Sequence, residues 1–136
     1  MSSLPVEQLM RLKESVLIER LDYLCEELGD PGRYFPDLRS KSVLNMTDTQ
    51  LIKSKATDRE KTEEFITLIS KRRSSHGQHG LDVFVDALKK QRVHAHVARV
   101  LLRSFNKKKA EAEKTCRFII VFECHKDSTD FNVSFF

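Results

Sequence analysis

The sequence contains no long apolar segment. No run of apolar residues approaches the ~20 residues that a helix needs to cross a bilayer. The first residues, "MSSLPVEQLMRLKE", also lack the cationic start and the apolar core of a secretory signal peptide. These two absences argue against a membrane span and against export, so we expect a cytoplasmic protein with no membrane partner.

Cysteine is scarce as well. Cys25, Cys116 and Cys124 form neither an even set nor the dense framework that stabilises small secreted domains. Such a set suits a reducing compartment, and we expect all three to be free thiols. Cys25 lies beside an apolar stripe, where packing explains it better than a role as a nucleophile.

Patterns for metal binding and catalysis are also missing. The candidate metal ligands occur only as three pairs, which are His76 with His79, His94 with His96, and Cys124 with His125. Residues two apart on a helix point ~200° apart, so His94 and His96 do not readily share an ion, and no C-x-x-C pair is present. A glycine-rich phosphate loop and a nucleophile elbow are absent too. We therefore predict no metal, no cofactor and no catalytic residue, and hence a protein that is not an enzyme.

The composition that remains is typical of one soluble globular domain. The chain has 136 residues, of which 40% are hydrophobic and 32% are charged. The net charge is +4 and the pI is about 9.0. This charge suits a nucleic acid, an acidic protein partner or no particular partner, so it does not decide the function.

Apolar spacing and helix-capping motifs predict the first four helices. A long first helix is expected over Val6–Leu28, because apolar residues recur there at helical spacing until Gly29 to Gly32 interrupt them. A short second helix should start near Pro36, a favoured position in a first turn. "TDTQ" at residues 47–50 and "TDRE" at 57–60 have the capping-box form, so the third and fourth helices should start there.

The second half of the chain predicts two more helices. The fourth helix should run to about Lys71, and a glycine-containing loop, "RSSHGQHG", follows it. The fifth helix is expected after Gly80 and the sixth from Val93. Their apolar stripes are Leu81, Phe84, Val85 and Leu88, then Val97, Val100, Leu101 and Phe105. Six helices with short connections predict an antiparallel bundle.

The composition changes after the sixth helix. The segment over residues 106–114 is polar on all sides, as expected for a frayed helix end or a linker. "CRFIIVFEC" at residues 116–124 is β-branched and aromatic, which favours a strand, yet no partner strand is evident. We expect a domain over residues 6–106, followed over 107–136 by a linker and a non-helical C-terminal tail.

Charged residues separate along the chain. Basic residues occur at Arg39, Lys41, Arg59 and Lys61 and again at residues 71–73, whereas acidic residues gather at Glu26, Glu27, Asp30, Asp37, Glu63 and Glu64. Each of these residues alone is best explained as solvated surface. Together, separated basic and acidic faces would let identical bundles associate head to tail, which forms open helical filaments when the rotation does not close.

These features resemble a caspase recruitment domain of the death-fold superfamily. The likeness rests on six helices, a long first helix and "GLDVFVDALKK" at residues 80–90, and it covers roughly residues 12–105. Further segments are similar to those of one adaptor in this family, namely "YLCE" at 23–26, "FPDLRSKSVL" at 35–44 and "DT" at 48–49. The resemblance implies an all-α, six-helix antiparallel death-fold bundle. It also implies a non-enzymatic signalling module that binds other recruitment domains and assembles filaments, in NF-κB activation or caspase-dependent death.

The resemblance further implies which residues bind a partner. In such domains a basic surface on the first and fourth helices meets an acidic surface on the second and third helices of a neighbour. The family's basic contacts on the second and fourth helices would fall on Arg39, Lys41, Arg59 and Lys61, and the acidic candidates are Glu26, Glu27, Asp37 and Asp48. The third predicted helix departs from an acidic pattern, because Gln50, Lys53 and Lys55 follow Asp48. The acidic half of the interface therefore stays open.

A helical nucleic-acid-binding module is the alternative. It would place residues 71–73, Arg99, Arg103 and residues 107–109 against phosphates. No aromatic residue is interleaved with these charges for stacking on bases, and no helix-turn-helix signature is evident. We therefore favour protein partners over nucleic acid.

Overall fold

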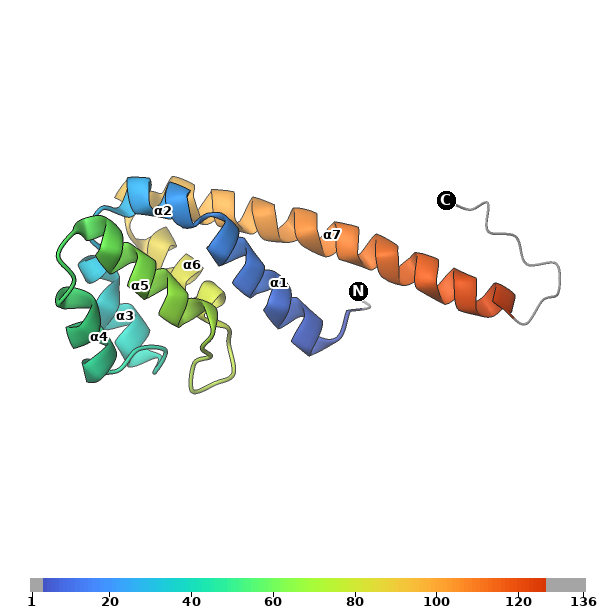
Figure 1. Ribbon diagram of the computed structural model, residues 1–136, viewed down its shortest axis with the longest axis horizontal. Helices are drawn as coiled ribbons and strands as arrows, with labels where there is room; N and C mark the ends of the chain where they lie inside the picture. Colours follow the sequence, from blue (N-terminus) through green and yellow to red (C-terminus); the bar gives the residue numbers. More distant parts are fainter. Residues whose placement is uncertain (1–3, 127–136) are drawn as a thin grey trace.

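The computed structural model describes residues 4–126, with side chains described for residues 4–114. This part of the chain contains α-helices and two short 3-10 helices but no strand, which confirms the predicted all-α bundle (Figure 1). The α-helices are α1 (Val6–Glu19), α2 (Leu21–Leu28), α3 (Phe35–Ser40), α4 (Met46–Lys53), α5 (Asp58–Ser70), α6 (Gly80–Lys90) and α7 (Ala95–Lys126). The 3-10 helices are η1 (Pro31–Tyr34) and η2 (Arg92–His94).

The predicted first helix is kinked into α1 and α2. Arg20 has φ −95° and ψ 13°, yet its N–H still donates to the Val16 carbonyl at 3.1 Å. Its own carbonyl accepts from the Leu24 N–H at 2.8 Å. Both parts pack on α5, and α1 also packs closely along α7. The apolar spacing continues across Arg20, which is why the sequence predicted one long helix.

Side-chain caps define the starts of α4 and α5. The N-cap of α4 is Asn45, which forms a capping box with Asp48 at hydrogen-bond distances of 2.8 and 2.9 Å. The prediction that Thr47 caps this helix was therefore wrong, because the cap lies two residues earlier, at Asn45. Thr57 does cap α5, as predicted, and its hydroxyl accepts from the Glu60 N–H at 3.1 Å.

The core lies where α1, α2, α5, α6 and the start of α7 meet. All four apolar residues predicted for the fifth helix, Leu81, Phe84, Val85 and Leu88, are buried on α6. The Phe84 ring makes edge contacts with Tyr34 and Phe65, with centroids 5.5 and 5.4 Å apart. The amphipathic pattern therefore identified the face of α6 that the bundle buries.

The α5–α6 loop brings two helices into close contact. The first residue of α6, Gly80, follows this loop and lies so near α5 that a Cβ atom there would be 2.0 Å from the carbonyl oxygen of Ile69. The His79 side chain caps α6, because its Nδ1 accepts from the Leu81 N–H at 3.0 Å. Glycine is thus required at residue 80 for the two helices to approach each other.

Helix α7 contradicts the prediction of a non-helical tail. It continues to Lys126, and Figure 1 shows its C-terminal part projecting beyond the other helices. Residues 95–126 contain neither Pro nor Gly, and residues 107–114 consist only of the strong helix formers Lys, Ala and Glu. A helix also satisfies the backbone of residues 116–124 without a partner strand. Residues 127–136 of the predicted tail lie outside the described residues, and the domain boundary at residue 106 stays a prediction.

Candidate protein-interaction surface

Arg39 and Lys41 are exposed at the C-terminal end of α3. Neither side chain forms an ion pair with another residue that the structure describes. The Lys41 carbonyl accepts a hydrogen bond from the Ser75 N–H at 3.1 Å, which ties the end of α3 to the α5–α6 loop. Two predicted basic residues therefore remain available to an acidic partner.

The other two predicted basic residues lie at the start of α5. The Arg59 guanidinium pairs with Asp22 of α2 at 2.5 Å and, more loosely, with Glu63 at 3.5 Å. The hydrogen bond to Asp22 raises the pKa of the Arg59 guanidinium above its ordinary value. Lys61 is half-buried. Arg59 therefore already has acidic partners within the chain, although its side chain stays half exposed.

Asp48 occupies a different environment from the one expected of an interaction residue. It is only 7% exposed, and its carboxylate forms an ion pair with Arg72 while also accepting from the Asn45 N–H. A buried carboxylate held by a guanidinium and a backbone amide is satisfied within the fold. Asp48 thus joins α4 to the end of α5.

The remaining acidic candidates differ in their availability. Glu27 pairs with His96 of α7 at 2.5 Å, and Asp37 pairs with Lys90 of α6 at 3.6 Å. Glu26 is exposed on α2 and makes no ion pair among the described side chains. Of the four predicted acidic residues, Glu26 is therefore the one free to meet a basic partner.

Sequence reasoning did not single out Asp22 or the pairing of Arg72. The Arg59–Asp22 pair joins residues 37 apart in the chain, and the Arg72–Asp48 pair joins residues 24 apart. Spacing within one helix reveals pairs three or four residues apart, but these two pairs arise only when helices pack. No local signal in the sequence could have found them.

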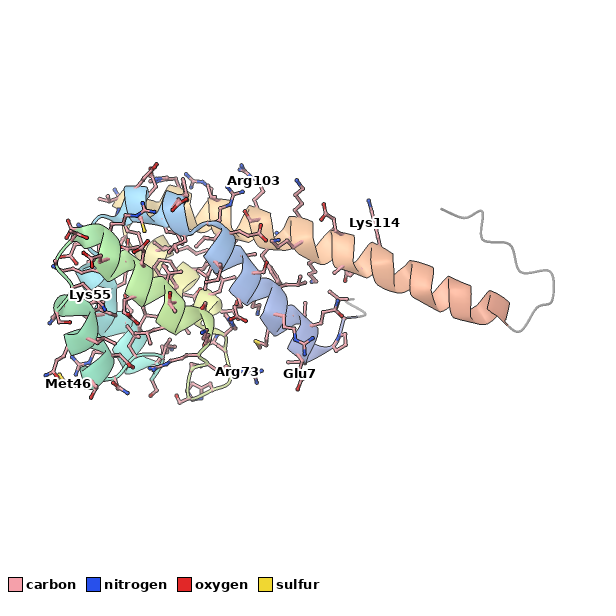
Figure 2. The ribbon with its side chains drawn as sticks, viewed as in Figure 1. Glu7, Met46, Lys55, Arg73, Arg103 and Lys114 are labelled. Carbon is pink, nitrogen blue, oxygen red and sulfur yellow. The ribbon has the colours of Figure 1, made fainter. Side chains whose placement is uncertain are left out.

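The basic residues proposed for nucleic acid do not form one stripe. Arg72 is occupied by Asp48, and Lys108 forms an ion pair with Glu19. Figure 2 shows Arg73 and Arg103 at opposite edges of the molecule. A continuous track of free cations along one face, which phosphate binding requires, is therefore not assembled from these residues.

Among the metal and nucleophile candidates, His79, His94 and Cys25 are buried in the bundle, whereas His76 is exposed. The side chains of Cys124 and His125 lie outside the described part of the chain. Within residues 4–114, no three His, Cys, Asp or Glu side chains gather as a metal site. The His94 ring accepts from the Tyr34 hydroxyl through Nδ1, and burial raises the pKa of Tyr34 to about 12. Cys25 is buried, and burial raises the pKa of its thiol, which disfavours the reactive thiolate.

Comparison with protein families identifies this bundle. The caspase recruitment domain model matches residues 8–104, and the chain belongs to this family. Comparisons with curated proteins and with solved structures gave no match. In the described part of the chain, no helix combines the length and the apolar character that a membrane crossing needs. The family consists of protein-interaction modules, so the chain has a homotypic protein-interaction role in signalling.

Proposed function

We propose that this chain is a signalling adaptor or regulator that associates head to tail with other caspase recruitment domains, including second copies of itself. The observation that carries the proposal is the family match over residues 8–104. The placement of exposed, unpaired charges on two different elements supports it further, because a heterologous contact needs two complementary patches on each copy.

The interface that we propose is smaller than the eight predicted residues. Its basic half is Arg39 and Lys41 at the C-terminal end of α3, and its acidic half includes Glu26 on α2. Arg59, Glu27, Asp37 and Asp48 already pair within the chain, so recruiting them would first require an internal pair to break. Arg59 and Asp22 can still contribute together at the rim, since the Arg59 side chain is half exposed and the Asp22 side chain is largely exposed.

The pathway is part of the same proposal. We place the chain in regulation of apoptosis or NF-κB signalling, in the cytoplasm. The segments at residues 23–26, 35–44 and 48–49 are similar to those of the B-cell lymphoma/leukaemia 10 adaptor.

Charge reversal tests the proposal directly. The full chain carrying Arg39→Glu and Lys41→Glu should lose the filaments or oligomers that wild type forms, as measured by light scattering and negative-stain microscopy. Arg99→Glu with Arg103→Glu is the matched control, since it changes the net charge equally on exposed α7 residues. Circular dichroism should show equal helicity in all three proteins.

Each outcome separates the alternatives. Assembly that is lost only in the α3 variant supports the proposed interface. Equal assembly of the α3 variant and wild type contradicts it. Salt-sensitive binding to random duplex that is lost only in the α7 variant would instead support the nucleic-acid function.

A further inference from the structure

The α5–α6 loop presents one serine to solvent and hides its neighbour. Ser74 is 7% exposed, and its hydroxyl oxygen accepts from the N–H groups of His76 and Gln78 at 3.2 and 3.1 Å. The Ser74 N–H also donates to the Gln78 carbonyl at 2.7 Å. These bonds close a compact turn whose tip, residues 75–78, is exposed. Ser75 is therefore accessible, whereas Ser74 is used to build the loop.

Most serine hydroxyls in the described part of the chain already have a hydrogen-bond partner. These are Ser15, Ser40, Ser54, Ser70, Ser74 and Ser104. Among the serines at residues 4–114, this leaves Ser42 and Ser75, both exposed, without a side-chain hydrogen bond. Ser42 has a φ of 65°, in the left-handed region, and only one arginine, Arg39, lies within the three residues before it.

The charges around Ser75 match those of a substrate of an arginine-directed kinase. The segment "KRRSS" places Arg72 and Arg73 three and two residues before Ser75. Arg72 is held by Asp48, but Arg73 and Lys71 are exposed, and Figure 2 shows Arg73 at the outer edge of the bundle. Kinases select substrates by such charge patterns, because acidic side chains in the kinase pair with substrate guanidinium groups.

We propose that Ser75 is a phosphorylation site for an arginine-directed serine kinase and that its phosphate blocks the basic surface at the end of α3. In the reaction, the Ser75 Oγ attacks the γ-phosphorus of ATP, the bond from that phosphorus to the bridging oxygen breaks, and ADP leaves. The hydroxyl proton passes to the catalytic carboxylate of the kinase. The product carries a phosphoserine at the tip of the loop.

The position of Ser75 gives the phosphate its effect. The hydrogen bond from the Ser75 N–H to the Lys41 carbonyl, 3.1 Å long, holds the loop tip against the end of α3. A phosphoserine brings about −1.5 to −2 charges near neutral pH, next to Lys41 and Arg73. It would neutralise the patch that the proposed function assigns to an acidic partner, so this regulatory effect rests on that function. The modification itself does not.

Phosphate incorporation tests the site. The full chain would be incubated with ATP, Mg²⁺ and the catalytic subunit of cyclic-AMP-dependent kinase, and the modified residue would be mapped by mass spectrometry. We expect one phosphate on Ser75, none on the Ser75→Ala variant, and unchanged incorporation into the control Ser42→Ala. Arg73→Gln should slow incorporation about tenfold, because it removes one charge-assisted hydrogen bond to the kinase.

Three outcomes would overturn the inference. Incorporation into Ser75→Ala at the wild-type rate would place the phosphate elsewhere. A folded chain that takes up no phosphate, while a peptide of residues 69–80 does, would show that the loop is not accessible. Phosphorylated chain that still assembles like the unmodified chain would remove the regulatory role. Failure of the unmodified chain to assemble would count against the proposed function only, because incorporation is read separately.

Discussion

His79 and His94 are buried histidines that stabilise the fold in their neutral form. His79 Nδ1 accepts from the Leu81 N–H, and His94 Nδ1 accepts from the Tyr34 hydroxyl. Burial is the main cause that lowers the pKa of both residues below the ordinary value. Protonation would turn each accepting nitrogen into a donor and would leave the Leu81 amide and the Tyr34 hydroxyl facing a second donor.

These two histidines predict a loss of stability in acid. The unfolded chain binds protons with the ordinary histidine pKa of 6.5, whereas the folded chain binds them only at lower pH. Stability is therefore complete above about pH 6.5 and falls as the pH decreases below it. Urea unfolding at about pH 7.5 and about pH 5.5 measures this difference.

The variant His79→Asn should reduce the pH dependence, because an asparagine N-cap accepts from backbone amides without titrating. Equal urea midpoints for wild type at both pH values would contradict this assignment. An unchanged pH dependence in the variant would leave His94 as the responsible residue.

Phe84 provides the corresponding test for the core. Its side chain is fully buried between Tyr34 and Phe65, so Phe84→Ala should cost ~3–5 kcal/mol by leaving a cavity. The control Val93→Ala removes an exposed apolar side chain and should change stability by less than about 0.5 kcal/mol. Thermal or urea unfolding measures both, and equal stability of Phe84→Ala and wild type would show that this stripe does not form the core.

At the scale of elements, the contact of α5 with α6 depends on Gly80. Gly80→Ala would place its methyl carbon only 2.0 Å from the carbonyl oxygen of Ile69 if the backbone did not move. This clash should cost ~1–3 kcal/mol of stability. Gly32→Ala is the matched control, because its Cβ would lie no closer than 3.3 Å to a neighbouring side chain. A variant at residue 80 that melts like wild type would mean that the helices can separate without cost.

The same scale shows how far local sequence patterns reach. The sequence predicted α3, α5 and α6, because α5 and α6 are amphipathic and begin at a capping side chain, and α3 begins next to Pro36. It missed the kink at Arg20, because apolar spacing does not record the direction in which each part of a helix packs. It also missed the length of α7, because the end of that helix has no apolar period and continues only for lack of a helix breaker. The sequence also could not distinguish exposed charges from charges that pair inside the fold. Asp48 and Arg72, for example, meet only after α4 packs on α5.

At the scale of the whole molecule, internal pairing determines what the surface can offer to a partner. The chain carries 24 basic and 20 acidic residues, so the net charge says little about any one face. Among the described side chains, Arg39 and Lys41 at the end of α3 and Glu26 on α2 form no ion pair, which provides the two unlike patches that head-to-tail association needs. The proposed function therefore predicts a directional assembly rather than a symmetric dimer.

A charge-swap mixture is the measurement that tests this account most directly. Arg39→Glu and Glu26→Lys, each in the full chain, should both fail to assemble alone, because one patch on every copy then repels its neighbour. Mixed in equal amounts, the two variants should form filaments again by alternating along the assembly, as seen by light scattering and negative-stain microscopy. Two folded variants that stay monomeric when mixed, or that each assemble alone like wild type, would contradict the proposed interface.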